Sequence, residues 1–563
     1  MKKILIILLT ILLLTSCGTK NQATIDGNKN YSLPEYYHYE PSDFYKKCDE
    51  LKSYIENNDK DKALELYDNL FEEAKSVYDL TVVCYIKYCE DVNNQYYIDE
   101  QQYIETTFDE LNNKFLTLCH LLTQSSFAKT FKKHIDNEEM YLDYEAYEEM
   151  SQEELDLLAK ENELQQKSNE IRDTIDDYIY TYKGKDYLYS EIMEMDESND
   201  LYPILVEGVS KKVNDDLGKI YVQLVEIRDK IAKLNDYDNY SLYADEQLYY
   251  RDYTKEDLDK FKAVVKEHGD ELFYFIYNSP YYGDSSLSGK QLINEVMPTL
   301  TSISPYIKDA YDVFENNKLY SITYGDGRYQ GSYETSLASE SAFIFINMSQ
   351  SDRDYFTLAH EFGHFTNAIL VNCPSILTRE GCYDVFEIHS TGLEMLFGQK
   401  ALELFGEEFN DNVASDLSEA LYCVLEGCIY DEFQRKVYEN PDMTLDEINN
   451  AFKETMKEYG LELLSETPAA QYDWMYVPHN FDSPMYYISY ATSAYAALQI
   501  WEKSLGNYNK AVKIWENILA ADVYNDGYVK IVSDAGLTSF TNKKSTEKLF
   551  DTTFEYLATS VEQ

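Results

Sequence analysis

Basic residues are scarce in this sequence. The 563 residues include 49 Lys and Arg against 102 Asp and Glu, which gives a formal net charge of −53. Affinity for nucleic acids depends on clusters of basic residues that displace counterions from phosphates, and the sequence has no run rich in Lys or Arg. We therefore expect no nucleic-acid partner.

Proline and glycine are also few, at 11 and 21 residues, so long flexible linkers are not expected. High net charge alone can indicate disorder. Here 44% hydrophobic and 15% aromatic residues supply enough apolar material for a core. The chain should fold.

A long hydrophobic run is missing everywhere except near the N-terminus. Lys2 and Lys3 precede an apolar run from Ile4 to Leu14, which at about a dozen residues is shorter than the roughly 20 that span a bilayer. This pattern is typical of a signal peptide. The Leu-Thr-Ser-Cys that ends it resembles a bacterial lipobox, in which the cysteine, here Cys17, receives the lipid. The alternative is an ordinary signal peptide with an accidental cysteine.

We accordingly predict that residues 1–16 are a lipoprotein signal peptide and residues 17–35 a lipid-anchored tether. The protein would then be an exported bacterial lipoprotein, anchored to the membrane at Cys17, with its body outside the cytoplasm. None of the eight other cysteines forms a CxxC pair, so neither a cysteine zinc cluster nor a thioredoxin-type site is indicated. We predict buried thiols.

The body should be mainly α-helical. Residues 36–205 form a predicted N-terminal helical region, because apolar residues recur three and four apart and strand patterns are nearly absent. One later segment differs: a turn-rich loop at 325–331 precedes SAFIFINM at 341–348, which is typical of a strand. This strand could be an edge that pairs with an extended substrate. Equally, it could belong to a small structural sheet.

Directly after that strand, a predicted helix carries the sequence HEFGH from His360 to His364. Histidines four apart lie on one helix face, so both can bind one metal ion, usually zinc. Glu361 lies between them and is placed to act as a general base on water. With 8 histidines in the chain, such a motif would arise by chance in only about 0.02 cases.

A catalytic zinc needs a third protein ligand. The metzincin pattern would place Gly and His at 367 and 370, where this chain has Asn and Leu. A glutamate on a following helix is the other common arrangement. The segment GCYDVFEIHSTGLEMLF offers Glu387 and, seven residues further on the same face, Glu394.

These residues resemble the thimet oligopeptidase and oligoendopeptidase F family of zinc peptidases. In that family the HExxH motif is followed by Asp-x-x-Glu, a Ser-containing turn and a further Glu. Asp384 to Glu387, Ser390 and Glu394 match this pattern. The resemblance implies one Zn²⁺ per chain, bound by His360, His364 and Glu387, with Asp384 and Glu394 orienting the ligands.

The likeness extends to a second segment, VPHNFDSPMYYISYAT at 477–492. It implies that His479 and Tyr490 donate hydrogen bonds to the oxyanion and that Tyr486 and Tyr487 contact substrate. Taken without the family, a histidine among tyrosines is more often packing. His389 stands where the family usually has a small residue or proline, and could be an additional orienting group or a rival ligand.

The resemblance also implies a large, helical, two-lobed body with a deep channel and one small β-sheet near the HExxH helix. Residues 206–563 would be the catalytic zinc-peptidase region. We expect a zinc-dependent endopeptidase (oligopeptidase) that hydrolyses short peptides with Glu361 as general base. The strong negative charge should favour cationic peptides.

Two alternatives remain. A lipid-anchored peptide-binding protein would be expected to show alternating βαβ halves, which this sequence lacks. A catalytically inactive peptidase homologue would not need Glu361. Neither alternative accounts for that residue.

Overall fold

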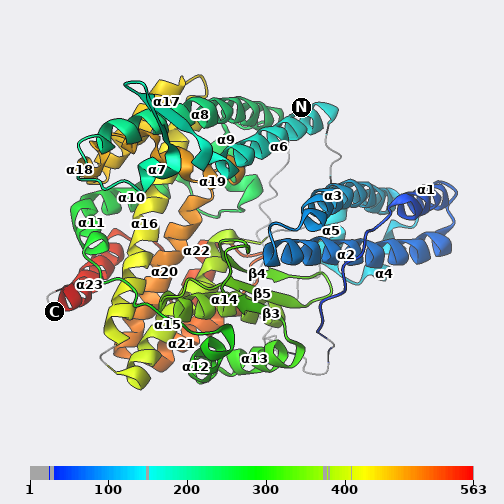
Figure 1. The fold of residues 1–563 in the computed structure, drawn as a ribbon. Helices are drawn as coiled ribbons and strands as arrows, with labels where there is room; N and C mark the ends of the chain where they lie inside the picture. Colours follow the sequence, from blue (N-terminus) through cyan, green and yellow to red (C-terminus); the bar gives the residue numbers. More distant parts are fainter. Residues whose placement is uncertain are drawn as a thin grey trace.

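The computed structural model describes residues 25, 29, 31–147, 151–371, 377, 381–406 and 409–561, and it is mainly helical, as predicted. Helices α1 to α5 form a lobe at one side of the molecule (Figure 1). The elements of this lobe are α1 (Ser42–Glu56), α2 (Lys60–Glu90), α3 (Gln95–Gln124), α4 (Ala128–Ile135) and α5 (Glu138–Ala146).

The remaining elements form the larger body. They are α6 (Gln152–Asp173), η1 (Ile175–Asp177), β1 (Ile179–Tyr182), β2 (Lys185–Leu188), α7 (Tyr189–Met193), α8 (Tyr202–Leu234), α9 (Tyr240–Tyr243), η2 (Ala244–Leu248), α10 (Lys255–Glu267), α11 (Gly269–Tyr277), α12 (Gly289–Thr301), α13 (Pro305–Asn317), β3 (Tyr320–Thr323), β4 (Ser332–Ser336), β5 (Ala342–Asn347), α14 (Arg353–Leu370), α15 (Tyr383–Phe405), α16 (Asn410–Tyr438), α17 (Leu445–Glu458), α18 (Glu462–Ser465), η4 (Ala470–Tyr476), α19 (His479–Asp482), α20 (Tyr487–Gly506), α21 (Tyr508–Leu519), α22 (Tyr528–Ala535) and α23 (Lys543–Val561).

The lobe has a core of its own, built from apolar faces of α1, α2 and α3 around Tyr67 and Phe115. The C-terminal end of α2 instead joins the core of the body through Val83 and Ile86. Helix α6 packs on α8 and belongs to that larger core through Leu157. The predicted N-terminal helical region 36–205 therefore divides into two packing groups.

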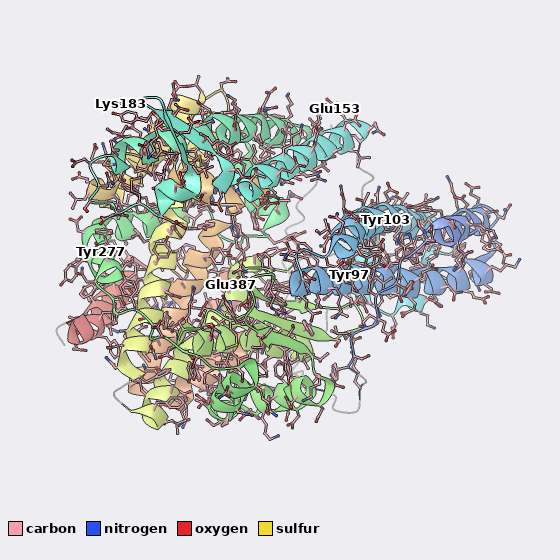
Figure 2. All side chains as sticks on the ribbon, viewed as in Figure 1. Tyr97, Tyr103, Glu153, Lys183, Tyr277 and Glu387 are labelled. Carbon is pink, nitrogen blue, oxygen red and sulfur yellow. The ribbon has the colours of Figure 1, made fainter. Side chains whose placement is uncertain are left out.

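In the body, α16 and α20 pack against each other and run through most of its height (Figure 1). Helix α20 also packs along α15. Helix α16 contacts α8 and α9 in the upper part, and α15 packs on α12 and α14 in the lower part that contains the sheet (Figure 1). The labelled Glu387 of α15 lies near the middle of the body (Figure 2), whereas Tyr97 and Tyr103 lie in the lobe.

The sheet beside α14 has the order β3-β5-β4. Strand β5 is parallel to β3, with Tyr320 opposite Ile344, and antiparallel to β4, with Glu334 opposite Ile344. The predicted strand 341–348 is thus present. Its proposed role as a free edge is wrong, because β5 is paired on both sides; β4 is the edge strand that borders the active-site cavity.

A second small sheet was not predicted. Strands β1 and β2 form an antiparallel hairpin in the upper part of the body, with Lys183 and Gly184 as its two turn residues. Both have positive φ angles, 50° and 79°, as a tight two-residue turn requires. The sequence IYTYKGKDYL alternates in the way that is typical of a hairpin. It is shorter than the helical patterns around it, so these dominated the prediction.

None of the helices in the described part of the chain has both the length and the apolar character needed to cross a membrane. The described cysteines all have free thiols, and all except the partly exposed Cys423 are buried. Cys84 and Cys89 lie on α2, and Cys423 and Cys428 lie on α16. Residues five apart on one helix point in different directions, which agrees with their free thiols. Cys17 and Cys373 lie outside the described residues.

Candidate active site

Helix α14 carries the HExxH residues, and Asp354 in its first turn holds it to the segment after β5. Asp354 accepts hydrogen bonds from the backbone N–H of Ser349 (2.7 Å) and of Gln350 (3.1 Å), which joins the helix to the end of β5. On its inner face Phe362 and Phe365 pack against Phe314 of α13. The polar face with His360, Glu361 and His364 is thereby turned to a cavity.

Gly363 lets α15 approach α14 closely. A Cβ atom at this position would lie 2.4 Å from the backbone O of His389 and 2.7 Å from the Cα of Ser390. No real side chain tolerates such contacts with backbone. The glycine inside HEFGH therefore sets the helix separation at which Glu387 of α15 can reach the two histidines of α14.

One ligand atom from each of His360, His364 and Glu387 lies within 4.8 Å of the others. Glu387 Oε2 is 3.4 Å from His360 Nε2 and 3.6 Å from His364 Nε2. Two ligand atoms of a tetrahedral zinc with bonds of about 2.0–2.1 Å are themselves about 3.3 Å apart. Two imidazoles and one carboxylate that meet at these distances fit a zinc ion in both chemistry and spacing.

Glu394, the other glutamate of that segment, does not belong to this group. Its Oε1 lies 2.6 Å from His360 Nδ1, the ring nitrogen that faces away from Glu387. A carboxylate on the far nitrogen fixes the tautomer and orientation of a histidine ligand. The structure thus separates Glu387, on the ligand side, from Glu394, on the supporting side.

The charges of this group reinforce one another. Although burial disfavours its charged form, contact with Glu394 and Glu387 raises the pKa of His360 well above its usual value. Likewise, although burial acts in the opposite direction, the two histidines hold the pKa of Glu387 well below its usual value. Glu387 is therefore ionised beside positive charge. A bound metal cation would stabilise the ionised carboxylate in the same way.

Glu361 is only 5% exposed and lines the cavity beside the three ligands. Burial raises the pKa of Glu361, and the neighbouring carboxylates of Glu387 and Glu394 add to the increase. A carboxylate with a raised pKa accepts a proton more readily, as a general base must.

Asp384 lies in the first turn of α15, three residues before Glu387. It accepts a hydrogen bond of 2.5 Å from Tyr253 and lies 3.7 Å from Arg251, and its side chain is fully buried. These contacts tie the first turn of α15 to the segment after η2. Asp384 therefore acts on Glu387 through the position of the helix and not through contact with a histidine ligand.

The tyrosine segment lies across the cavity from α14. Tyr490 and Tyr486 line the cavity, and the Tyr486 hydroxyl donates to Glu387 Oε1 over 3.3 Å. The Tyr490 hydroxyl lies 3.4 Å from His479 Nε2, while Tyr487 packs edge-on against Tyr430. The structure thus brings Tyr486 and Tyr490 to the cavity at the candidate metal site, with His479 packed against both, and Tyr487 does not line this cavity.

His389 points away from the three ligands. Its Nε2–H donates to the backbone O of Ile518 (3.3 Å), and its own backbone O accepts from the Trp515 indole (2.9 Å). Burial lowers the pKa of His389 to about 3, so the ring is neutral near pH 7. It packs α15 on α21 and is not part of the candidate ligand group.

The cavity at the ligands has a volume of about 620 Å³, and a second one of about 530 Å³ adjoins it. His360, Glu361 and Glu394 line both cavities, so the candidate metal centre lies where the two meet. Cavities of this size are typical of ligand-binding sites.

Several cavity residues were not predicted from the sequence: Glu334 of β4, Arg353 of α14, and Asp416 and Glu419 of α16. Burial, together with the Glu394 carboxylate, raises the pKa of Asp416 well above its usual value, so Asp416 is placed to share a proton with Glu394. Glu419 pairs with Arg353 at 3.2 Å. No local pattern marks Glu334, Asp416 and Glu419, because they reach the site from β4 and α16, and Arg353 lies two turns before His360 without a motif of its own.

Two histidines on one helix and a glutamate on the following helix form the candidate ligand group, and a buried glutamate lies between the two histidines. This arrangement is typical of the HExxH metallopeptidase class. Comparison with known proteins agrees: residues 306–519, which span the sheet and α14 to α21, match peptidase family M3. Over these residues the chain is similar to peptidase family M3, and it is also similar to oligoendopeptidase F.

Among curated relatives, "Oligoendopeptidase F, chromosomal" of Lactococcus lactis subsp. cremoris is 24% identical over 315 residues. That alignment covers 54% of this chain and 45% of the relative, so the chain spans about half the length of the curated relative it matches.

Solved structures share the fold over nearly the whole chain. "PZ peptidase A with inhibitor 2" has a TM-score of 0.70 at 19% identity and covers 93% of this chain and 98% of its own. Oligoendopeptidase-F from Enterococcus faecium has a TM-score of 0.58 at 14% identity and covers 92% and 96%. The overall fold is therefore that of oligoendopeptidase F.

Proposed function

We propose that this protein is a zinc-dependent endopeptidase (oligopeptidase) that hydrolyses peptide bonds of short peptides, with Glu361 as general base. The observation that carries this proposal is the convergence of His360, His364 and Glu387 at spacings of a tetrahedral metal site, with Glu361 beside them in a cavity. The match of residues 306–519 to peptidase family M3 supports it.

His360, His364 and Glu387 would hold one Zn²⁺ per chain. A zinc ion in such a site lowers the pKa of water toward about 7 and polarises a carbonyl oxygen. Glu394 holds the His360 ring with its Nε2 toward this point, and Ser390 donates to Glu387 Oε2 over 3.2 Å. These contacts keep the ligand atoms in place before any ion binds.

Glu361 takes the proton from the attacking water and then delivers it to the nitrogen of the leaving amine. Both transfers need a carboxylate that is close to the ligands without being one of them. Glu361 meets this condition because it lines the cavity but is not among the three converging residues. Its burial keeps bulk water from competing for the proton.

Tyr490 and His479 are the proposed donors to the oxyanion that forms on the scissile carbonyl. Burial lowers the pKa of His479, so its imidazole is neutral near pH 7 and can exchange a hydrogen bond with the Tyr490 hydroxyl. We assign the direct contact to Tyr490, because Tyr490 lines the cavity while His479 stacks behind Tyr486. One such donor contributes about 10²- to 10³-fold in rate.

We also propose that the protein is exported and held at a membrane by a lipid on Cys17. The support is the lipobox-like sequence alone, since Cys17 lies outside the described residues. The polar residues that follow Cys17 would act as a tether for the body.

The test is cleavage of a mixed library of short peptides by the full chain, with products identified by mass spectrometry. We expect cleavage that stops when a chelator removes the metal and returns when one equivalent of zinc is added. Cleavage that survives complete metal removal would contradict the proposal. Binding of peptides without any cleavage by zinc-loaded protein would instead indicate a peptide-binding or inactive homologue.

A further inference from the structure

We propose that Glu334 of β4 selects the substrate: its carboxylate receives the side chain of a lysine or arginine next to the bond that is cleaved. This inference rests on the proposed peptidase function and adds a specificity-determining residue to it. It concerns a side chain on the edge strand and none of the residues assigned to metal or catalysis.

The side chain of Glu334 is directed into the cavity by the alternation of β4. Successive side chains of a strand point to opposite faces. Tyr333 faces Phe345 and Tyr85, with ring centroids 5.2 Å away in both cases, so its ring packs between the sheet and α2. Glu334 then points the other way, and it lines the same cavity as Glu361 and His364.

Glu334 has no cationic partner of its own. Its hydrogen bond is to the Ser336 hydroxyl (3.0 Å), and no lysine or arginine in the described part of the chain forms an ion pair with it. Burial raises the pKa of Glu334 to about 7, and the Glu361 carboxylate adds to the increase, while His364 and Ser336 act in the opposite direction. A partly buried carboxylate without a cationic partner is costly, and a cation from a ligand would relieve that cost.

Besides the two candidate ligand histidines, the described residues that line the cavity around Glu334 include one basic side chain. Its described lining includes seven carboxyl side chains and one arginine: Glu334, Glu340, Glu361, Glu387, Glu394, Asp416, Glu419 and Arg353. Arg353 is already paired with Glu419 at 3.2 Å. Apart from the two candidate ligand histidines, the described lining therefore has no unpaired cationic side chain, and we infer that a lysine or arginine that pairs with Glu334 comes with the substrate.

The position of Glu334 along β4 places that charge close to the cleaved bond. Ser332 lines both cavities together with His360 and Glu361, whereas Glu334 lines only the one that contains His364. Residues two apart on a strand are about 7 Å apart. An extended peptide alongside β4, with its carbonyl at the metal site, would thus bring the side chain of an adjacent residue to Glu334.

The experiment uses peptides blocked at both ends, so that a free N-terminal amine cannot supply the charge. In a quenched fluorescent series, each position around the cleavage site carries in turn lysine or its neutral analogue acetyl-lysine. The wild-type full chain, loaded with zinc, should prefer lysine at one position by roughly ten- to a hundredfold in kcat/KM, as expected for a charge-assisted hydrogen bond. Glu334→Gln should bring this ratio to about one.

Glu340→Gln is the matched control. Glu340 lines the same cavity and carries the same charge, but it already pairs with Lys29. We expect its lysine to acetyl-lysine ratio to stay near that of the wild type. A fall of similar size in both variants would show a general effect of cavity charge and would overturn the assignment to Glu334.

Charge reversal and binding provide the remaining arms. Glu334→Lys should prefer glutamate over glutamine at the same position. Fluorescence anisotropy with labelled, blocked peptides and the Glu361→Gln variant measures the same preference without turnover, so it distinguishes failure of this inference from failure of the peptidase function. Equal binding of lysine and acetyl-lysine peptides, or equal ratios for wild type and Glu334→Gln, would refute the role of Glu334.

Discussion

Glu394 and His360 form the contact that supports the candidate metal site most directly, at 2.6 Å. Replacing Glu394 by glutamine keeps the shape but removes the charge that orients the imidazole. We expect zinc affinity to fall about 10- to 100-fold, as is typical when the partner of a histidine ligand is lost. Competition with a chromophoric chelator measures this change.

Glu419→Gln serves as the control for that measurement. Glu419 lines the same cavity, but it forms an ion pair with Arg353 and not with a candidate ligand. Its zinc affinity should stay within a few-fold of the wild type. If Glu394→Gln binds zinc as tightly as Glu419→Gln, Glu394 does not orient His360.

His389 makes a second residue-level prediction, on stability. Its folded-state pKa of about 3 lies below the unfolded value of about 6.5, so below pH 6.5 the unfolded chain binds more protons at this residue. The stabilisation from a neutral His389 is complete above pH 6.5 and is lost as the pH falls toward 3.

Between pH 6.5 and 5.5, metal-free wild type should lose about 1 kcal/mol more free energy of unfolding than His389→Asn. Urea unfolding at both pH values, with a chelator present, measures the difference. Equal losses in the two proteins would show that His389 is not buried in a neutral form.

Residues close together in sequence were the easiest to predict. His360, Glu361 and His364 share one helix turn, so their spacing alone indicates a common metal. Choosing Glu387 over Glu394 needed the family resemblance, because both lie on the same face of α15 and only the crossing at Gly363 decides which one meets the histidines. Glu334 and Asp416 could not be found, because they are close to the site only in space.

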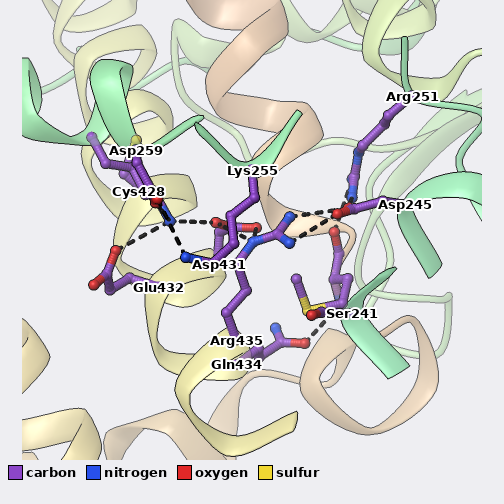
Figure 3. Close-up of polar contacts among 12 residues, drawn as sticks. Ser241, Asp245, Arg251, Lys255, Asp259, Cys428, Asp431, Glu432, Gln434 and Arg435 are labelled. Atoms are coloured by element: carbon purple, nitrogen blue, oxygen red, sulfur yellow. Dashed lines mark hydrogen bonds and ion pairs between the residues drawn. The ribbon is translucent and has the colours of Figure 1, made fainter. Parts of the chain in front are cut away.

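At the scale of elements, a network of buried charges connects α10, α16, η2 and the segment after η2 (Figure 3). Asp431 pairs with Lys262 and Arg435, and Arg435 reaches Asp245 over 2.8 and 3.0 Å. Asp245 in turn accepts from Arg251 at 2.7 Å. The charges alternate in sign from Lys262 to Arg251, so each ion of this network has a partner of opposite charge.

Arg251 joins this network to the active site. Its guanidinium donates to the backbone O of Met485 (2.9 Å) and to the Ser489 hydroxyl (3.0 Å), and it lies 3.7 Å from Asp384. Met485 has a positive φ of 69°, a conformation that non-glycine residues rarely adopt without support. Arg251 thereby fixes the turn before Tyr486 and, through Asp384, the helix that carries Glu387.

We therefore expect Arg251→Met to lower kcat about 10²-fold by misplacing the tyrosine segment, with zinc content unchanged. It should also lose stability, because it breaks a buried ion pair. Steady-state kinetics and zinc analysis of the purified protein check both expectations.

Lys262→Met is the control at the other end of the network. It removes a buried cation that pairs with Asp431 and Glu432, far along the chain of charges from Met485. Its stability should fall in a similar way while kcat stays near the wild-type value. Equal losses of kcat in the two variants would show a general structural effect and contradict a positioning role for Arg251.

Secondary structure was predictable where a pattern repeats over many residues, as in the helices with apolar positions three and four apart. The position of β5 in its sheet was not, because strand pairing depends on β3 and β4, which are short and flank a loop. The β1–β2 hairpin was missed for a related reason. Its four-residue strands are much shorter than the helices α6 and α8 whose patterns surround them.

At the scale of the whole molecule, composition indicated a folded, acidic protein and the apolar periodicity a mainly helical one, but neither indicated its shape. The two-part body and its channel were expected only from the family resemblance. The division between α1 to α5 and the rest depends on which helix faces share a core, and α6 joins the body because Leu157 and Leu164 pack there. No boundary signal in the sequence marks that change.

The predicted lipid on Cys17 would determine where the whole molecule is found in the cell. Cys17→Ser should move the full-length protein from the membrane fraction to the medium or periplasm and abolish labelling by a radioactive fatty acid. Cys423→Ser, which alters a thiol of the body, should leave both properties unchanged. A wild-type protein that incorporates no fatty acid would contradict the anchor.

The central claim is that Glu361 performs general base catalysis at a zinc ion held by His360, His364 and Glu387. The most direct measurement compares hydrolysis of quenched fluorescent peptides by wild type and Glu361→Gln, each shown to hold one zinc per chain. The account predicts a loss of about 10²- to 10⁴-fold in kcat for the variant at equal zinc content. Undiminished cleavage by Glu361→Gln, or no cleavage of any library peptide by the zinc-loaded wild type, would contradict it.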